Sequence, residues 1–200
     1  MLRKAVYPKV EKLLKQIASF LHTKGFTPNQ LTVAGLALNF IAGCFYAVGF
    51  LFLGGFTILI AALGDLLDGP LARTSNQVTK FGAFLDSTLD RYSDFFIFGG
   101  LALCFARQNE AGWFLVTLGI IAGAFVTSYS KARAENLIES CSVGYFERAE
   151  RVILIALGTL LPFILPLVLW VLLLGTNITA LQRILFVRKT LAAQEEKKSS

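Results

Sequence analysis

Six long apolar stretches follow one another along this chain, and they restrict it to the folds of integral membrane proteins. The stretches lie near residues 31–52, 54–73, 80–106, 112–135, 148–165 and 166–187. Most approach the ~20 residues that a helix needs to cross the hydrocarbon core of a bilayer. Of the 200 residues, 55% are apolar and only 16% are charged, whereas soluble domains average about 25% charged residues. The sequence therefore predicts an all-α integral membrane protein of six transmembrane helices, built as a single domain over 1–200.

Two segments of the chain differ from the regular pattern of long apolar stretches. Residues 2–22 alternate apolar and basic positions at helical spacing, which predicts an amphipathic helix lying on the membrane surface. The alternative is a solvated cytosolic helix. Pro162 and Pro166 interrupt the apolar run between Val152 and Leu174. We expect a tight turn between the last two spans there, the alternative being one overlong kinked helix.

The placement of positive charge predicts the orientation of these spans. With six spans, 18 of the 19 Lys and Arg residues fall on one side, and only Arg107 falls on the other. Positive residues flank membrane spans on the cytoplasmic side. We therefore expect a multi-pass protein of the cell membrane with both termini in the cytoplasm. The net charge of +6 flanks apolar spans, so it does not predict a nucleic-acid partner.

Four aspartates occur where apolar side chains would be expected. Asp65 and Asp68 are three residues apart near the end of the second span, and Asp86 and Asp90 are four apart near the start of the third. On a helix, each pair lies on one face. The two helices are joined by a short polar turn and should pack antiparallel, which would bring the carboxylates together at the cytoplasmic side.

A cluster of four carboxylates predicts bound divalent cations. Like charges at close range would otherwise force protons onto some of them. Carboxylate oxygens suit Mg²⁺ and Mn²⁺, and two metals about 4 Å apart stabilise displacement at phosphorus. The alternatives are a cation path or proton relay through the membrane, or carboxylates that are merely solvated. With a single histidine, His22, and three scattered cysteines, neither a histidine base nor a zinc or disulfide framework is expected.

The aspartates belong to a longer pattern, D-x2-D-G-x2-A-R-x8-G-x3-D-x3-D. The matching residues are Asp65, Asp68, Gly69, Ala72, Arg73, Gly82, Asp86 and Asp90. This string resembles the signature of the CDP-alcohol phosphotransferase family. Eight fixed positions would match by chance at on the order of 1 in 10¹⁰ starts, given ~5% usage of each residue. The resemblance implies six spans, an N-terminal surface helix and a homodimer.

The resemblance also implies roles for these residues. Asp65, Asp68, Asp86 and Asp90 would hold two divalent cations, Mg²⁺ or Mn²⁺, and Asp90 would also be the catalytic base. The base would take a proton from an acceptor hydroxyl, which attacks the β-phosphorus of a CDP-linked lipid and releases CMP. The residues implied to bind the CDP-lipid are Pro28, Asn29, Thr32, Asp68, Gly69, Ala72, Arg73 and Gly82.

A second cluster of charge, level with the aspartates, bears on the acceptor. Its cations are Lys131, Arg133, Arg148, Arg151 and Arg183. Several guanidinium groups converging on one pocket suit a phosphate, which predicts a small phosphorylated polyol as substrate. The alternative is that these cations only anchor helix ends at lipid headgroups, and for Lys131 the two interpretations weigh equally.

The surrounding sequences SYSKARAE and GYFERAER resemble the branch of the family that uses inositol 1-phosphate, with either a diacyl or an archaeal ether lipid. Glycerol 3-phosphate, the acceptor of phosphatidylglycerophosphate synthase, is the nearest alternative. A divalent-cation or proton transporter is the alternative of a different class. It predicts acidic residues spread through the bilayer depth and repeated halves, and neither is present in the sequence.

Overall fold

The chain folds into long helices joined by short turns. The computed structural model describes residues 2–199, with side chains over 13–196, and no strand occurs within the described range. The helices are α1 (Leu2–Thr23), α2 (Pro28–Ala47), α3 (Leu51–Thr74), α4 (Lys80–Arg107), α5 (Ala111–Ala134), α6 (Arg148–Leu160) and α7 (Leu165–Ser199), with a short 3-10 turn at Pro162–Ile164. The all-α prediction is confirmed.

Helix boundaries follow local capping chemistry. The hydroxyl of Thr27 accepts a hydrogen bond from the backbone N–H of Gln30, whose side chain accepts in return from the N–H of Thr27. This capping box, with Pro28 in the first turn, starts α2 three residues before the predicted span. Thr79 caps α4 in the same way, accepting from the N–H of Gly82 at 2.9 Å.

The turn predicted near Pro162 and Pro166 is present in the structure. The chain breaks at Leu161, passes through Pro162–Ile164 and re-enters a helix at Leu165, so a single kinked helix is excluded. Pro70 lies inside α3, and the helix continues through it to Thr74. The predicted sixth span, 166–187, is part of a longer helix, because α7 continues through the basic residues that follow it.

Only some of the six predicted transmembrane helices have the length and the apolar composition that are needed to cross a membrane. Four segments are long and apolar enough to cross a bilayer: α2, α3, α5 and Pro162–Glu196. Helix α4 has 28 residues, but its first half carries the charged residues from Asp86 to Asp94. Helix α6 has only 13 residues, about 20 Å at 1.5 Å per residue, against a hydrocarbon core of about 30 Å. The protein is a membrane protein with four candidate spans.

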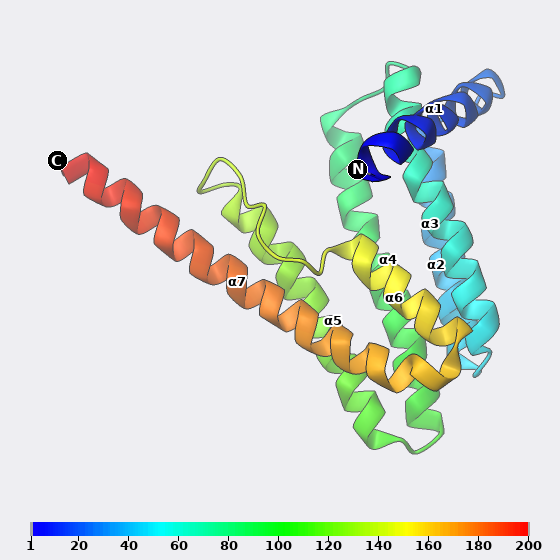
Figure 1. Ribbon diagram of the computed structural model, residues 1–200. Coiled ribbons are helices and arrows are strands. Elements are labelled where there is room, and N and C mark those ends of the chain that lie inside the picture. Colours follow the sequence, from blue (N-terminus) through cyan, green and yellow to red (C-terminus); the bar gives the residue numbers. More distant parts are fainter. Residues whose placement is uncertain (1, 200) are drawn as a thin grey trace.

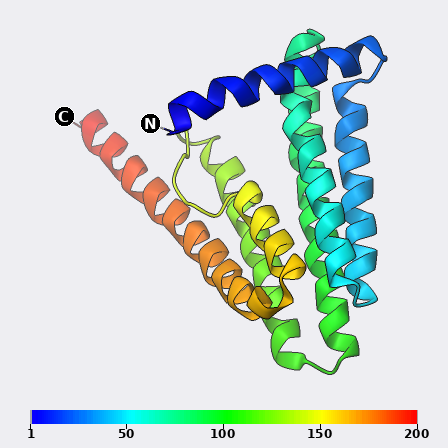
Figure 2. The ribbon, with the colours of Figure 1, turned by 45° about the vertical axis from the view of Figure 1, so that its right-hand side comes forward.

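The helices form two groups joined through α4 and α6. Helix α2 packs against both α3 and α4, while α5 packs against α4 and α7, and α6 packs against α3 and α7 (Figure 1). Figure 2 shows α1 lying across the ends of the α2–α4 group. Within the described residues, α3 and α4 each pack extensively on α2 and at most weakly on each other. The predicted packing of α3 on α4 is therefore largely replaced by packing of both helices on α2.

Small residues allow α2 and α4 to approach closely. A methyl group at position 100 would lie 2.1 Å from the carbonyl oxygen of Gly43, and one at position 43 would lie 2.3 Å from that of Phe96. Only glycine fits these two positions, and membrane helices commonly associate through such contacts. The hydroxyl of Tyr46 lies 2.8 Å from that of Thr159 and joins α2 to α6 inside the core.

Candidate active site

The four aspartates lie near one another on α3 and α4, since Asp65 and Asp90 share Arg148 and Asp68 and Asp86 line one pocket. Asp65 and Asp68 lie in the second half of α3, and Asp86 and Asp90 in the first half of α4. We call these four residues the aspartate cluster. A methyl group at position 35 would lie 2.8 Å from Oδ1 of Asp65, so Gly35 of α2 makes room for this carboxylate. The sequence analysis missed Gly35, because nothing in the motif links it to position 65.

Asp68 has one satisfied and one unsatisfied oxygen. Its Oδ2 accepts a hydrogen bond of 3.1 Å from the hydroxyl of Thr32. Its Oδ1 is buried and has no hydrogen-bond partner. An unpaired buried carboxylate oxygen is costly, and a cation is the partner it lacks.

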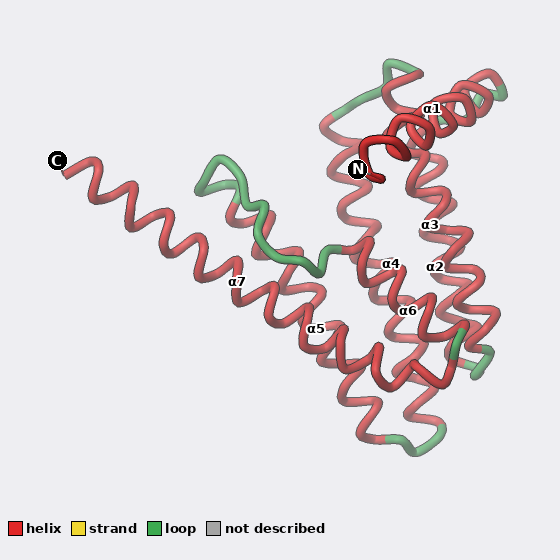
Figure 3. The backbone as a smooth tube through the Cα atoms, in the orientation of Figure 1, coloured by secondary structure: helices red, strands yellow, loops and turns green. Residues whose placement is uncertain are grey.

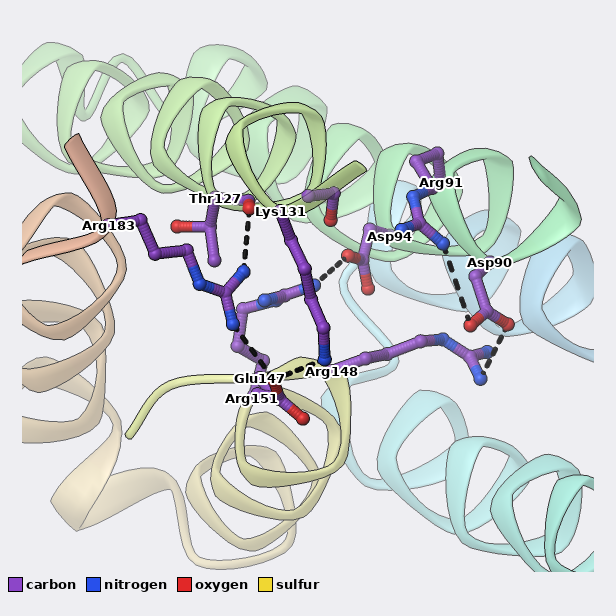
Figure 4. Close-up of a pocket in the computed structure, with 10 residues that line it drawn as sticks. Asp90, Arg91, Asp94, Thr127, Lys131, Glu147, Arg148, Arg151 and Arg183 are labelled. Atoms are coloured by element: carbon purple, nitrogen blue, oxygen red, sulfur yellow. Dashed lines mark hydrogen bonds and ion pairs between the residues drawn. The ribbon is translucent and has the colours of Figure 1, made fainter. Parts of the chain in front are cut away.

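Arg148 lies between the two helices that carry the cluster. Its Nη1 is 2.7 Å from Oδ2 of Asp65 and 2.8 Å from Oδ1 of Asp90. Arg148 is the first residue of α6, and its side chain extends toward Asp90 in Figure 4. This guanidinium is the countercharge that connects the two aspartate pairs.

The oxygen donors of the aspartate cluster suit a hard divalent cation, provided that the side chain of Arg148 moves. Four carboxylates and the unpartnered Oδ1 of Asp68 are the oxygen donors that Mg²⁺ and Mn²⁺ prefer. Within the part of the chain that the structure describes, however, no three acidic, histidine or cysteine side chains converge closely enough to hold an ion. Arg148 fills the space between Asp65 and Asp90, so a metal there requires the guanidinium to move.

One pocket opens beside Asp68 and Asp86, between α2, α3 and α4. We call it the α2–α4 pocket; its volume is about 170 Å³. Its lining includes seven of the eight residues expected to bind the CDP-lipid: Pro28, Asn29, Thr32, Asp68, Gly69, Ala72 and Gly82. The eighth, Arg73, is exposed at the pocket's edge, with its Nη1 3.5 Å from where a Cβ on Gly69 would lie. With Asp86, the residues Gln77, Val78, Thr79 and Ala83 complete the wall, and these last four were not predicted to bind the CDP-lipid.

A second pocket, the cationic pocket, lies on the other side of Asp90 and has a volume of about 190 Å³. Its lining comes from four helices and is shown in Figure 4: Asp90, Arg91, Asp94, Thr127, Ser128, Lys131, Glu147, Arg148, Arg151 and Arg183. Five of these side chains are cationic and three are anionic. The excess of positive charge suits an anion.

Four of the five cations predicted for the acceptor phosphate line this pocket, and Arg133 does not. Arg133 is exposed near the end of α5. Residues two apart on a helix point in different directions, so Lys131 and Arg133 cannot both face the pocket. Arg148 and Arg151 are three apart and both reach it.

The buried arginines are held by partners that the sequence analysis did not identify. Arg151 pairs with Asp94 at 2.5 Å, and both side chains are almost completely buried. The three guanidinium nitrogens of Arg183 donate to the carbonyls of Val143 and Thr127 and to the carboxylate of Glu147. Asp94 ends the GDLLDG…DRYSD segment, but spacing alone gave no reason to pair it with a residue 57 positions away.

The long loop between α5 and α6 closes the cationic pocket. It is the longest loop in Figure 3 and runs from Glu135 to Glu147. Phe146 accepts a hydrogen bond from Arg151 through its carbonyl and donates its N–H to Thr179. Glu147 also accepts from Lys131 at 2.9 Å. Helices α5, α6 and α7 are thereby joined at the rim of the pocket.

The sequence matches a known protein family over most of its length. The family model for CDP-alcohol phosphatidyltransferase matches residues 26–189. The chain belongs to this family. The resemblance drawn from the aspartate pattern is confirmed, and the protein is an enzyme of the phospholipid synthase class rather than a transporter.

Individual relatives refine this assignment. A phosphatidylinositol phosphate synthase of Streptomyces avermitilis is 36% identical over 94% of this chain and 83% of its own length. An archaetidylinositol phosphate synthase of Pyrococcus horikoshii is 38% identical, over 78% of this chain and 80% of its own.

Solved structures agree in fold. The Mycobacterium tuberculosis phosphatidylinositol phosphate synthase, crystallised with CDP-DAG bound, has a TM-score of 0.82 and 32% identity, covering 88% of this chain and 94% of that one. The same synthase in complex with manganese and citrate has a TM-score of 0.80 and 33% identity, covering 87% and 88%. Family membership together with the manganese complex supports the use of divalent metal by this enzyme.

Proposed function

We propose that this enzyme transfers a phosphatidyl-type group from CDP-diacylglycerol, or an archaeal CDP-ether lipid, to inositol 1-phosphate, giving phosphatidylinositol phosphate and CMP. The observation that carries the proposal is the meeting of two different pockets at one aspartate cluster. Asp68 and Asp86 line the α2–α4 pocket, and Asp90 lines the cationic pocket. The names of the Streptomyces and Pyrococcus relatives support the same pair of substrates.

The α2–α4 pocket would receive the cytidine and phosphates of the CDP-lipid. Gly69 and Gly82 line it without side chains, which lets a ligand approach the backbone of α3 and α4. Asn29 and Thr32 offer polar groups from the first turns of α2, and Arg73 adds a positive charge at the edge. The CDP-DAG bound by the mycobacterial synthase supports a ligand of this class.

The cationic pocket would receive the phosphate of the acceptor. Lys131, Arg148 and Arg91 are the cations there with partly exposed side chains. Arg151 and Arg183 lie deeper and are already paired with carboxylates. They would therefore act on the phosphate through the positive electrostatic potential of the pocket as much as through direct contact. Arg133, which lies outside the pocket, would at most attract anions to it.

The chemistry follows from this division. The acceptor hydroxyl oxygen forms a bond to the β-phosphorus, the bond from that phosphorus to the bridging oxygen breaks, and CMP leaves with the electron pair. Asp90, which lines the cationic pocket one helical turn after Asp86 of the α2–α4 pocket, would take the hydroxyl proton. Asp65, Asp68, Asp86 and Asp90 would hold two divalent cations, Mg²⁺ or Mn²⁺, which supply neutralisation of the phosphates.

The membrane placement belongs to the same proposal. Helices α4 and α6 would cross the bilayer beside the four apolar spans, giving six, and α1 would lie on the membrane surface. Both termini and both pockets would face the cytoplasm of the cell membrane, where the Lys and Arg residues concentrate. The enzyme would work as a homodimer, as the family resemblance implies.

An acceptor panel tests the substrate assignment. Purified enzyme in detergent micelles with CDP-diacylglycerol and Mg²⁺ should release CMP with inositol 1-phosphate, and far less with glycerol 3-phosphate, inositol, glycerol or serine. EDTA should stop the release, and Mg²⁺ or Mn²⁺ should restore it. Faster CMP release with glycerol 3-phosphate would contradict the acceptor, and no release with any member would contradict the reaction.

A further inference from the structure

Arg148 differs from the other buried arginines in how its guanidinium is held. Arg151 and Arg183 each donate to backbone carbonyls as well as to a carboxylate. The hydrogen bond and ion pairs that Arg148 makes within the described residues go to aspartates of the cluster, through Nη1, and its buried Nε has no hydrogen-bond partner. In the part of the chain that the structure describes, its ion pairs are to Asp65 and Asp90, so removal of their negative charge would weaken the hold on this guanidinium.

The same side chain is part of two sites. Arg148 bridges the aspartate cluster and also lines the cationic pocket beside Lys131. A divalent cation bound to Asp65 and Asp90 would use the oxygens that Arg148 now contacts. Two cations sharing those oxygens at close range repel each other, and a long arginine stem allows the guanidinium to turn away.

We propose that Arg148 is a placeholder cation, which neutralises Asp65 and Asp90 until a divalent cation displaces it. The displaced guanidinium then joins Lys131 in the cationic pocket as a ligand for the acceptor's phosphate. The first half concerns the metal alone, whereas the second half rests on the proposed function. Metal binding would thereby create part of the acceptor site, and the two binding events would favour each other. By linkage, an acceptor phosphate would strengthen metal binding by the same factor.

A metal titration without substrates tests the first half. Free Mn²⁺ is followed by electron paramagnetic resonance while it is added to wild type, Arg148→Gln and Arg133→Gln in detergent micelles. Arg133→Gln is the matched control, since it removes the same charge from an exposed position that lies outside the cationic pocket. Arg148→Gln should bind Mn²⁺ about 10-fold more tightly or better, the equivalent of one lost charge-assisted contact, with the control within about 2-fold of wild type. Equal or weaker binding by Arg148→Gln would overturn the proposal.

Thermal stability gives a second readout and covers a variant that folds poorly. In EDTA, Arg148→Gln should melt below wild type because its carboxylates lack a countercharge, and saturating Mn²⁺ should close that gap. If Arg148→Gln cannot be purified, Arg148→Lys takes its place. The lysine side chain ends one bond short of the position of Nη1, so it should hold the two carboxylates less closely, and this variant should bind Mn²⁺ more tightly than wild type by a smaller factor. Unchanged binding in Arg148→Lys would overturn the proposal equally.

Calorimetry with inositol 1-phosphate, in the absence of CDP-lipid, tests the second half. Wild type should bind it more tightly with Mn²⁺ present, and Arg148→Gln should lose this coupling while Arg133→Gln keeps it. Coupling that persists in Arg148→Gln would refute the movement into the cationic pocket. If wild type released no CMP in the acceptor panel, the proposed function would fail, and the Mn²⁺ titration would still decide whether Arg148 is displaced.

Discussion

At the scale of single residues, the buried pair of Arg151 and Asp94 matters for stability as much as for the site. The two side chains are 2% and 5% exposed and lie 2.5 Å apart. Removing one member of such a pair leaves an uncompensated buried charge, which typically costs about 3–5 kcal/mol. Arg151 therefore supports the cationic pocket by holding α6 on α4.

Arg151→Gln and Asp94→Asn should each destabilise the protein by about 3–5 kcal/mol, and the double variant should lose less than the sum of the two. The measurement is unfolding of detergent-solubilised protein, analysed as a double-mutant cycle. Arg133→Gln, at an exposed position, should change stability by no more than about 0.5 kcal/mol. Losses under about 1 kcal/mol in both single variants, or strict additivity, would show that the pair is not a structural link.

At the scale of elements, Glu147 joins three helices at the rim of the cationic pocket. It immediately precedes α6 and pairs with Lys131 of α5 and Arg183 of α7. The hydrogen bond from Lys131, together with the charge of Arg183, holds the pKa of the Glu147 carboxyl below its ordinary value. About half of its side chain is exposed, so solvent screens these interactions and their effect should be modest.

This lowered pKa predicts a pH dependence of stability. A depressed pKa in the folded state contributes stability that is complete above the ordinary value of about 4.3 and is lost as the pH falls through the lower, folded value. Between pH 6 and pH 3, the thermal midpoint of wild type should therefore fall further than that of Glu147→Gln. Glu139→Gln, an exposed position in the same loop, is the control and should follow wild type. Parallel curves for wild type and Glu147→Gln would refute the link.

The helices and the aspartate faces could be predicted because they depend on short-range patterns. Apolar runs, Thr-Pro capping and proline breaks act over a few residues, and spacings of three and four placed Asp65 with Asp68 and Asp86 with Asp90. The pairing of Arg151 with Asp94 and of Arg183 with Glu147 could not be predicted from short-range patterns. The first pair joins residues 57 positions apart and the second joins residues 36 positions apart. The role of α2 as the main neighbour of both α3 and α4 could not be predicted, because a short turn suggests that α3 and α4 pack mainly on each other, whereas both pack extensively on α2.

At the scale of the whole molecule, positive charge is distributed unequally between the two ends of the helices. Figure 2 shows the chain ends and the α5–α6 loop toward the same end of the molecule, with the turn between α4 and α5 at the opposite end. The basic residues concentrate at the first end, and Arg107 ends α4 at the other. This asymmetry is the pattern expected of a protein with its site in the cytoplasm.

Cysteine labelling tests this orientation. In a background without the three native cysteines, a cysteine at Asn109 in the α4–α5 turn should react with an impermeant maleimide added to intact cells. A cysteine at Ser75, in the α3–α4 turn, should react only after the cells are opened. Labelling of Ser75 from outside would contradict both the six-span topology and the cytoplasmic position of the aspartate cluster.

The central claim is that one pocket recognises the acceptor's phosphate while the adjoining aspartates carry the transfer. Michaelis curves in inositol 1-phosphate, at saturating CDP-diacylglycerol, test it most directly for wild type, Lys131→Gln and Asp90→Asn. Lys131→Gln should raise the acceptor KM about 10-fold or more and leave kcat nearly unchanged, since it removes a charge-assisted contact. Asp90→Asn should lower kcat by about 100-fold or more, because it removes the base. An unchanged acceptor KM in Lys131→Gln, or wild-type turnover in Asp90→Asn, would contradict the account.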